Sequence, residues 1–192
     1  YFKSHAFQSI TTEDFVDYFN KNLINGDKAL ADKIKLDDWV YKPGIPSNII
    51  TPVSEDFNSI DNIQKKWRKT GVKGLSQKIK STNEKQHFID YLPNDLTAEE
   101  MATIDKEFNF TNGGNFVVRR QWFIQAIQHQ YKAAYPAIEK FLTSYSRTGS
   151  LLPLYKEMIK TPEGKTWAKQ IYSKAKSGYH ATTIQAVDSI LK

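Results

Sequence analysis

Apolar side chains along this sequence recur mostly at the three- and four-residue spacing of helices. Phe15, Phe19 and Leu23 lie on one such stripe near the start. Trp122 and Ala126 lie on another, within the strongest helical pattern of the chain. Val, Ile and Thr do not alternate with polar residues over any convincing run, so no strand is predicted. The pattern therefore predicts an all-α protein.

Capping residues and breakers set the expected ends of the helices. Ser81 and Thr97 each precede a glutamate by three positions, which indicates a capping box. Pro153 falls in the first turn of an expected helix, where proline is tolerated. About nine or ten helices are predicted, at residues 12–24, 27–40, 56–70, 81–92, 97–108, 116–131, 136–145, 151–160, 161–176 and 180–191.

Short connections between these helices make successive helices antiparallel neighbours. Helical hairpins of this kind stack into a right-handed, double-layered superhelix, as in armadillo and HEAT arrays. No clean repeat is visible in the sequence, so the array is expected to be irregular. The fold prediction is thus an armadillo/HEAT-like α-α superhelix.

The stretch Asp38–Pro46 interrupts this helical pattern. Two prolines flank Gly44, and the aromatic residues Trp39 and Tyr41 precede them. Proline fixes its own backbone and restricts the residue before it, so this composition favours a rigid, extended crossing over a flexible tether. We expect a junction here, at which one folded body is anchored to the next.

Composition limits the possible chemistry of the chain. Its 192 residues suffice for one large domain, or for a domain with a fragment of another. Cysteine is absent, which excludes disulfides, thiolate zinc sites and cysteine nucleophiles. No stretch approaches the roughly 18 to 20 apolar residues of a membrane span, so no membrane partner is expected. The chain begins at Tyr1 and not at Met, so we expect a processing or expression boundary there.

The net charge of +6 comes from one region, residues 61–85, which carries eight basic and two acidic residues. A nucleic-acid patch is one interpretation of this cluster. The other is a solvated helix face, and we favour it because Arg68 is the only arginine in the run and arginine is preferred for bidentate phosphate contacts. No nucleic-acid partner is therefore expected.

Patterns that would indicate catalysis within the chain are missing. The histidines His5, His87, His129 and His180 are far apart, and no His-Glu-x-x-His occurs. No Gly-x-Ser-x-Gly elbow occurs. We therefore predict no catalytic residue and no metal ligand in this chain.

Arginine residues provide the only candidate binding chemistry. Arg119 and Arg120 open the helix at 116–131 and are interpreted as surface charges or as a buried pair with a neighbouring helix. Arg147 lies in a turn beside Gly149. There it could clamp a carboxylate beyond the edge of the array, or it could cap the preceding helix, and spacing alone favours the cap.

Several segments together resemble the C-terminal part of the leukotriene A(4) hydrolase and aminopeptidase B group of zinc aminopeptidases. The most specific is Trp-x-Tyr-x-Pro-Gly-x-Pro at residues 39–46, and the resemblance covers nearly the whole chain. The segments that carry it are Ser9–Phe15, Trp39–Pro46, Phe108–Phe110, Arg119 with Trp122, Arg147, Pro153–Tyr155 and His180. By this resemblance, residues 1–36 are the last helices of the preceding catalytic domain, residues 37–59 are the proline-containing junction and residues 60–192 are the helical C-terminal domain.

The resemblance implies a catalytic zinc, bound by His-Glu-x-x-His and a distant Glu, in a domain before Tyr1. It also implies that the helical domain closes one side of the active-site cleft. In the family, an Arg and a Lys two residues later reach toward the C-terminal carboxylate of the substrate. Arg147 matches the Arg, whereas Gly149 occupies the position of the Lys. One charge-assisted contact would remain where the family has two.

The expected function is that of a C-terminal domain which shapes the cleft of a zinc-dependent aminopeptidase and is not catalytic alone. Arg147 is its expected substrate-binding residue, and its partners are the preceding catalytic domain and short peptides. The protein is expected to be soluble, and cytoplasmic or exported in a bacterium. The alternative is a helical-repeat scaffold that binds a protein partner along its concave face.

Overall fold

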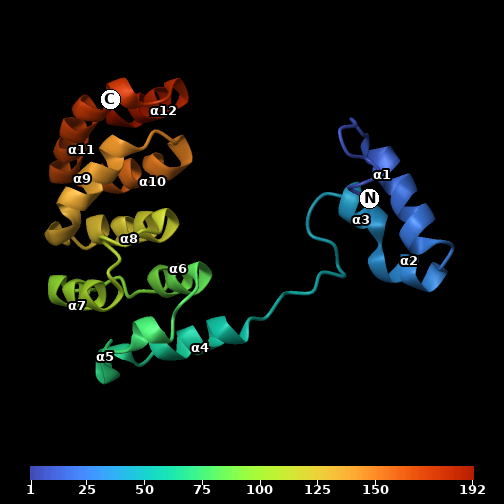
Figure 1. Cartoon of the computed structure of the whole chain (residues 1–192), viewed down its shortest axis with the longest axis horizontal. Helices are drawn as coiled ribbons and strands as arrows, with labels where there is room; N and C mark the ends of the chain where they lie inside the picture. The colour runs from blue at the N-terminus through green and yellow to red at the C-terminus, as the bar shows by residue number, and fades with distance from the viewer. The chain divides into compact units, whose positions relative to one another are not determined.

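The computed structural model describes residues 1–192 and contains helices joined by turns, with no strand (Figure 1). The chain divides into two compact units, Tyr1–Val53 and Ser54–Lys192. The all-helical prediction is confirmed. None of the helices is both long enough and apolar enough to cross a membrane.

Unit 1 consists of short helices. α1 (Thr12–Phe19) continues as a π-helical turn to Ile24, so the helix predicted at 12–24 is present. The helix predicted at 27–40 is instead two helices, α2 (Lys28–Ile34) and α3 (Leu36–Val40). They are separated by Lys35, whose backbone is left-handed with φ 53° and therefore ends the first helix.

Polar contacts, more than buried rings, hold the expected junction in unit 1. The Trp39 indole N–H donates to Asn48 Oδ1 at 3.1 Å. The Asn48 amide in turn donates to the carbonyls of Lys33 and Ile34, both at 2.8 Å, which satisfies two free carbonyls at the end of α2. Trp39 itself remains 49% exposed. The ring is anchored by its hydrogen bond and not by packing.

Unit 2 contains the remaining helices. They are α4 (Glu55–Gln64), α5 (Trp67–Thr70), α6 (Thr82–Asp90), α7 (Ala98–Phe108), α8 (Phe116–Gln128), α9 (Tyr135–Ser144), α10 (Thr148–Met158), α11 (Pro162–Ala175) and α12 (Ala181–Leu191), with 3₁₀ turns at 75–77, 132–134 and 176–178. Glutamates close capping boxes with Ser81 on α6 and with Thr97 on α7, as predicted.

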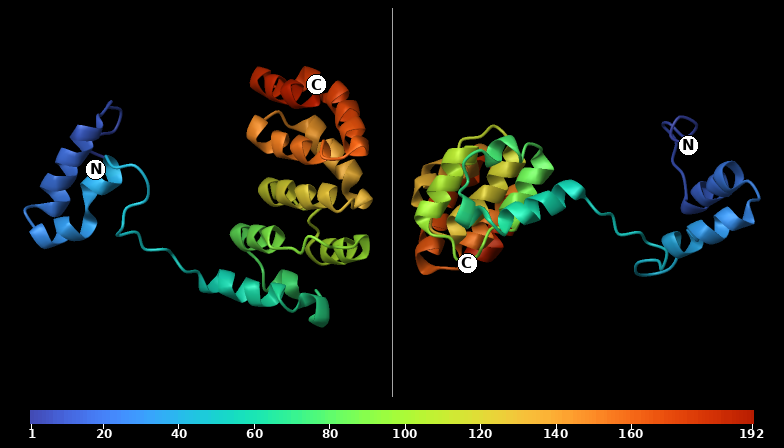
Figure 2. Two further views of the ribbon diagram at one scale, coloured as in Figure 1. Left: turned by 180° about the vertical axis from the view of Figure 1, so that it is seen from behind. Right: turned by 90° about the horizontal axis from the view of Figure 1, so that it is seen from below.

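These helices form two layers. α4, α6, α8, α10 and α12 pack successively against one another in one layer, and α9 packs against α11 in the other (Figures 1 and 2). Asn115 and Thr82, at the starts of α8 and α6, are hydrogen-bonded to each other. Gln121 and Asp90 join later positions of the same two helices, so α6 and α8 run parallel. The starts of these helices therefore lie along one edge of the unit.

A continuous apolar core fills the space between the layers. Trp122, Tyr155, Phe88, Phe123 and Phe141 are its largest fully buried side chains. The polar atoms of Trp122 and Tyr155 are hydrogen-bonded within this core. The Trp122 indole N–H donates to the Thr111 hydroxyl at 2.9 Å, and the Tyr155 hydroxyl bonds that of Tyr179. The core makes unit 2 a rigid support for whatever lies on its edges.

Two expected helix bounds in unit 2 differ from the structure. The helix predicted at 56–70 breaks into α4 and α5 around Lys66, which has a non-helical backbone. α10 begins at Thr148, three residues before the predicted start at Leu151, so Pro153 lies inside the helix. Because proline has no N–H, the Gly149 carbonyl has no helical partner there.

Candidate functional site

Arg147 lies at the N-cap of α10, where the connection from α9 enters the helix. Its backbone is extended, with φ −77° and ψ 116°, and its side chain is exposed and makes no capping hydrogen bond. The structure thus does not place Arg147 as a cap on the end of the preceding helix. Its guanidinium is available to a ligand outside the unit.

A hydroxyl network beneath Arg147 fixes this connection. Thr183 of α12 is fully buried and its hydroxyl donates to the Ser146 carbonyl at 2.6 Å. Since that hydroxyl has only one hydrogen, Thr148 must be the donor in its 2.6 Å contact with Thr183. Thr182 lies 3.2 Å from the Thr148 hydroxyl. The residues on both sides of Arg147 are therefore tied to the start of α12.

The electrostatics of this place favour an anion. The first turns of α10 and α12 lie next to each other, joined by the contact between Thr148 and Thr183. The N–H groups of these first turns carry the positive ends of two helix dipoles, and Arg147 adds a full charge. His180 caps α12 by accepting from the Thr182 N–H through Nδ1, so it supports the turn. The arrangement can bind a carboxylate by charge-assisted hydrogen bonds.

Gly149 is the second residue of α10 and is exposed. Apart from its chain neighbours and the backbone of its own helix, no atom lies within 4 Å of the place that a Cβ would occupy there. A longer side chain would therefore fit, so steric demand does not explain the glycine. Only one basic side chain is present in this turn.

Arg119 and Arg120 are not freely solvated surface charges, and neither makes an ion pair within 4 Å. Both are half-buried, and the Nε of each is buried without a hydrogen bond. Arg119 instead lies over the rings of Phe123 and Phe141. Arg120 lies near Asp90, whose pKa is raised by burial.

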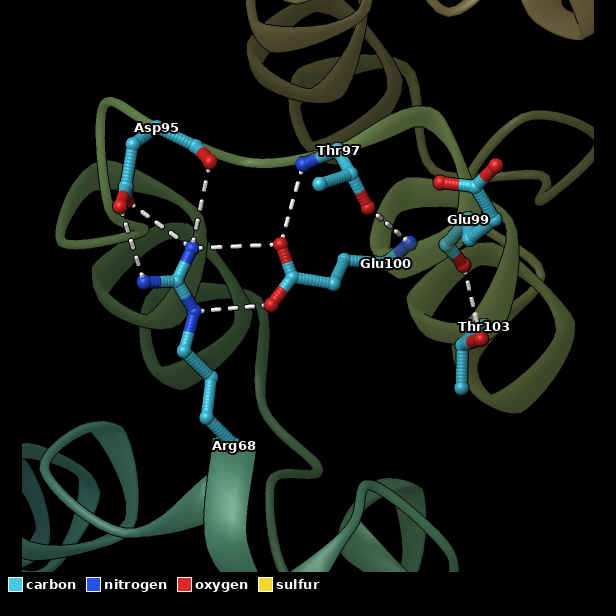
Figure 3. A network of polar contacts seen from close by, with 6 residues as sticks. All are labelled: Arg68, Asp95, Thr97, Glu99, Glu100 and Thr103. Carbon is cyan, nitrogen blue, oxygen red and sulfur yellow. Dashed lines mark hydrogen bonds and ion pairs between the residues drawn. The ribbon is translucent and has the colours of Figure 1, made fainter.

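Arg68, the only arginine of the basic region at 61–85, forms ion pairs with carboxylates of the same unit (Figure 3). Arg68 Nε contacts Glu100 at 2.8 Å and Arg68 Nη2 contacts Asp95 at 2.9 Å. Hydrogen bonds to Asp95 and Glu100 raise the pKa of Arg68, and the hydrogen bond from Arg68 lowers the pKa of Asp95. Glu100 also belongs to the capping box of Thr97. Arg68 therefore ties α5 to the start of α7 and is not free to bind phosphate.

No three metal-binding side chains come together anywhere in the chain. His87 stacks on Phe57 and bonds Asp61 at 2.7 Å, whereas His180 caps a helix. His129 is partly buried, which lowers its pKa. The residues present do not fit a zinc site.

The sequence singled out Arg147 but not the threonines that fix its surroundings. Thr182 and Thr183 lie together at the start of a predicted helix, which is a common place for hydroxyl residues. Nothing in the sequence shows that they contact Ser146 and Thr148, because that pairing depends on α10 and α12 being neighbours.

Comparison with known proteins identifies relatives over the whole chain. Residues 80–191 match the sequence model of the family described as leukotriene A4 hydrolase, C-terminal. Leucine aminopeptidase 2-1 of Meyerozyma guilliermondii is 24% identical over 204 residues, covering 94% of this chain and 32% of that protein. The structure of native yeast LTA4 hydrolase matches with a TM-score of 0.80 at 19% identity, covering 100% of this chain and 34% of that chain.

This chain thus spans about a third of the length of both proteins. The structural match confirms the all-α superhelical fold, and the three findings together confirm the resemblance drawn from the sequence motifs.

Proposed function

We propose a function for this chain on the premise that it belongs to the leukotriene A4 hydrolase C-terminal family. It forms the C-terminal region of a zinc-dependent aminopeptidase, shapes one side of the active-site cleft and helps to bind the C-terminal carboxylate of short peptides. Zinc, held by the preceding catalytic domain, would polarise the attacked carbonyl and its water. This chain supplies no ligand to that ion and is not catalytic alone.

One observation carries the substrate-binding part of the proposal: Arg147 is exposed, unpaired and firmly supported. The bonds of Thr183 and Thr148 hold the turn on both sides of it. A cationic residue whose backbone is held in place before the ligand arrives loses less entropy on binding than one in a mobile loop would. Arg147 therefore suits recognition of a carboxylate at a fixed distance from the reacting peptide bond.

Unit 1 supports the proposal that a further domain covers this chain. Ile24 is its only buried apolar side chain. Several large apolar side chains are instead exposed, namely Phe2, Phe7, Leu23, Ile45, Ile50 and Val53. Exposed apolar surface of this extent is typical of an interface. We assign it to contact with the preceding catalytic domain of the same polypeptide.

The test is the Arg147→Ala variant of the full-length enzyme. We expect kcat/KM for tripeptides to fall roughly tenfold to a hundredfold, because one charge-assisted hydrogen-bond pair to the carboxylate is lost. Amino-acid arylamides have no such carboxylate, so their hydrolysis should change little. Steady-state kinetics on both substrate classes measure the difference.

Arg147→Lys is the matched control, since it keeps the charge and removes the guanidinium fork. It should recover part of the tripeptide activity. Equal losses on tripeptides and arylamides would show that Arg147 supports the enzyme structurally and does not bind the carboxylate.

A further inference from the structure

A second basic site lies on unit 2, between the start of α8 and the length of α9. Figure 1 shows where these two helices lie. It is an open groove with a volume of about 380 Å³. Arg119 lines it, together with Pro136, Phe141 and Tyr145. The connection Tyr145–Arg147 leads from one end of this groove to the start of α10, so that end lies on the same edge of the unit as Arg147.

Arg119 in this groove has an unfilled hydrogen-bonding capacity. Its Nε is buried from solvent and makes no hydrogen bond. Its guanidinium carbon lies 5.3 Å from the ring centre of Phe123 and 5.7 Å from that of Phe141. The two rings hold the guanidinium in place while leaving its N–H groups without an acceptor. A buried donor without a partner is rare and calls for an explanation.

The charge of the groove is one-sided. Lys140 lines it together with Arg119, and no aspartate or glutamate does. Neither cation takes part in any ion pair of the structure. Other basic residues of this unit, such as Arg68 and Lys174, are paired with carboxylates. An anion entering the groove would thus meet two uncompensated positive charges.

The walls of the groove indicate what the anion is attached to. Phe116, Phe141 and Tyr145 form a ring cluster with centroids 4.7–4.8 Å apart, and Phe141 and Tyr145 line the groove with Pro136. An apolar group gains from contact with such walls, whereas a fully hydrated ion does not. We propose that the groove binds a terminal carboxylate attached to an apolar residue, with Arg119 as its bidentate donor.

This inference is independent of the proposed function of Arg147. The donor here is Arg119, on a different helix, and the proposal needs no peptidase activity. The chain contains four arginines, Arg68, Arg119, Arg120 and Arg147. Each gives one Nε–H signal in a spectrum of the ¹⁵N-arginine-labelled chain, so each can be followed separately.

The experiment is a titration of the labelled chain with N-acetyl-phenylalanine at constant ionic strength. We expect the Arg119 signal to shift in a saturable manner. N-acetyl-phenylalaninamide, which lacks the carboxylate, should leave it unchanged. The α-amide of N-acetyl-glutamate presents a side-chain carboxylate without the apolar group, and it should bind clearly more weakly.

Arg119→Gln should weaken binding of N-acetyl-phenylalanine roughly tenfold or more, because the charge-assisted bonds are lost. Arg120→Gln removes the same charge one position further along α8 and should leave binding unchanged. If Arg119→Gln fails to fold, the titration of the wild-type chain still tests whether Arg119 binds the carboxylate. The proposal would be overturned if the Arg119 signal did not shift with N-acetyl-phenylalanine. It would also be overturned if the signal shifted equally with N-acetyl-phenylalaninamide or with the α-amide of N-acetyl-glutamate.

Discussion

At the scale of single residues, Thr183 controls the position of Arg147 without contacting its side chain. Its buried hydroxyl donates to the Ser146 carbonyl and accepts from Thr148. The motif resemblance singled out Arg147 because an exposed functional arginine lies within a recognisable sequence segment. The supporting hydroxyls were not predictable, since they come from a helix more than thirty residues away.

A substitution at Gly149 tests carboxylate binding at this place by adding a second positive charge. In the full-length enzyme, Gly149→Lys should lower KM for tripeptides several-fold, because it adds a second cation beside Arg147 and space is available at this position. Steady-state kinetics would measure the change. Gly149→Ala is the control, since it changes helix propensity without adding charge. A KM that falls equally in both variants would attribute the gain to the helix.

At the scale of elements, side-chain caps decided most of the helix starts that the sequence could predict. The glutamates that follow Ser81 and Thr97 by three positions are local signals, and both capping boxes are present. The start of α10 was predicted wrongly because no side chain caps it. Its first residue, Thr148, is held by α12 instead, and such a tertiary contact leaves no local pattern.

Glu107 joins two elements in a pH-dependent way. Its Oε1 accepts from the Ser76 hydroxyl at 2.6 Å and from the Ser76 N–H at 3.0 Å, linking α7 to the turn at 75–77. These bonds lower the pKa of Glu107 below its ordinary value of 4.5. A lowered folded-state pKa contributes stability that is present above the unfolded pKa and is lost as pH falls through the folded one.

Glu107→Gln should therefore reduce the free energy of unfolding at neutral pH. The difference from the wild type should shrink as pH falls below about 4.5, the ordinary value of this group. Urea unfolding at several pH values measures both chains. A difference that does not depend on pH would mean that the carboxylate charge contributes nothing to the link.

At the scale of the whole chain, the core is distributed very unevenly between the two units. Every buried apolar side chain except Ile24 belongs to unit 2. Helical spacing predicted which residues face a core. It could not predict that the apolar residues of unit 1 remain exposed or only half-buried, since the stripe of Phe15, Phe19 and Leu23 has the same periodicity as a buried one.

Residues 54–192 alone should therefore fold, because their core is continuous and complete. We expect a cooperative thermal transition by circular dichroism for this fragment and none for residues 1–53. The full chain should unfold at nearly the same temperature as the fragment. A fragment 54–192 that lacks a sharp transition would show that unit 1 contributes essential packing.

α6 and α8 run parallel, and the starts of α10 and α12 are likewise joined to each other. The loops of unit 2 therefore fall into two sets, one at each end of these helices. Segments 109–115, 145–147 and 176–180 lead into helix starts on one edge, where Arg147 and one end of the groove lie. Turns such as 159–161 reverse the chain at the other ends of the helices. Insertions in these turns lengthen loops at little thermodynamic cost and leave the binding edge in place. Turns such as 159–161 can therefore vary in length and sequence during evolution, while selection preserves the edge that carries Arg147.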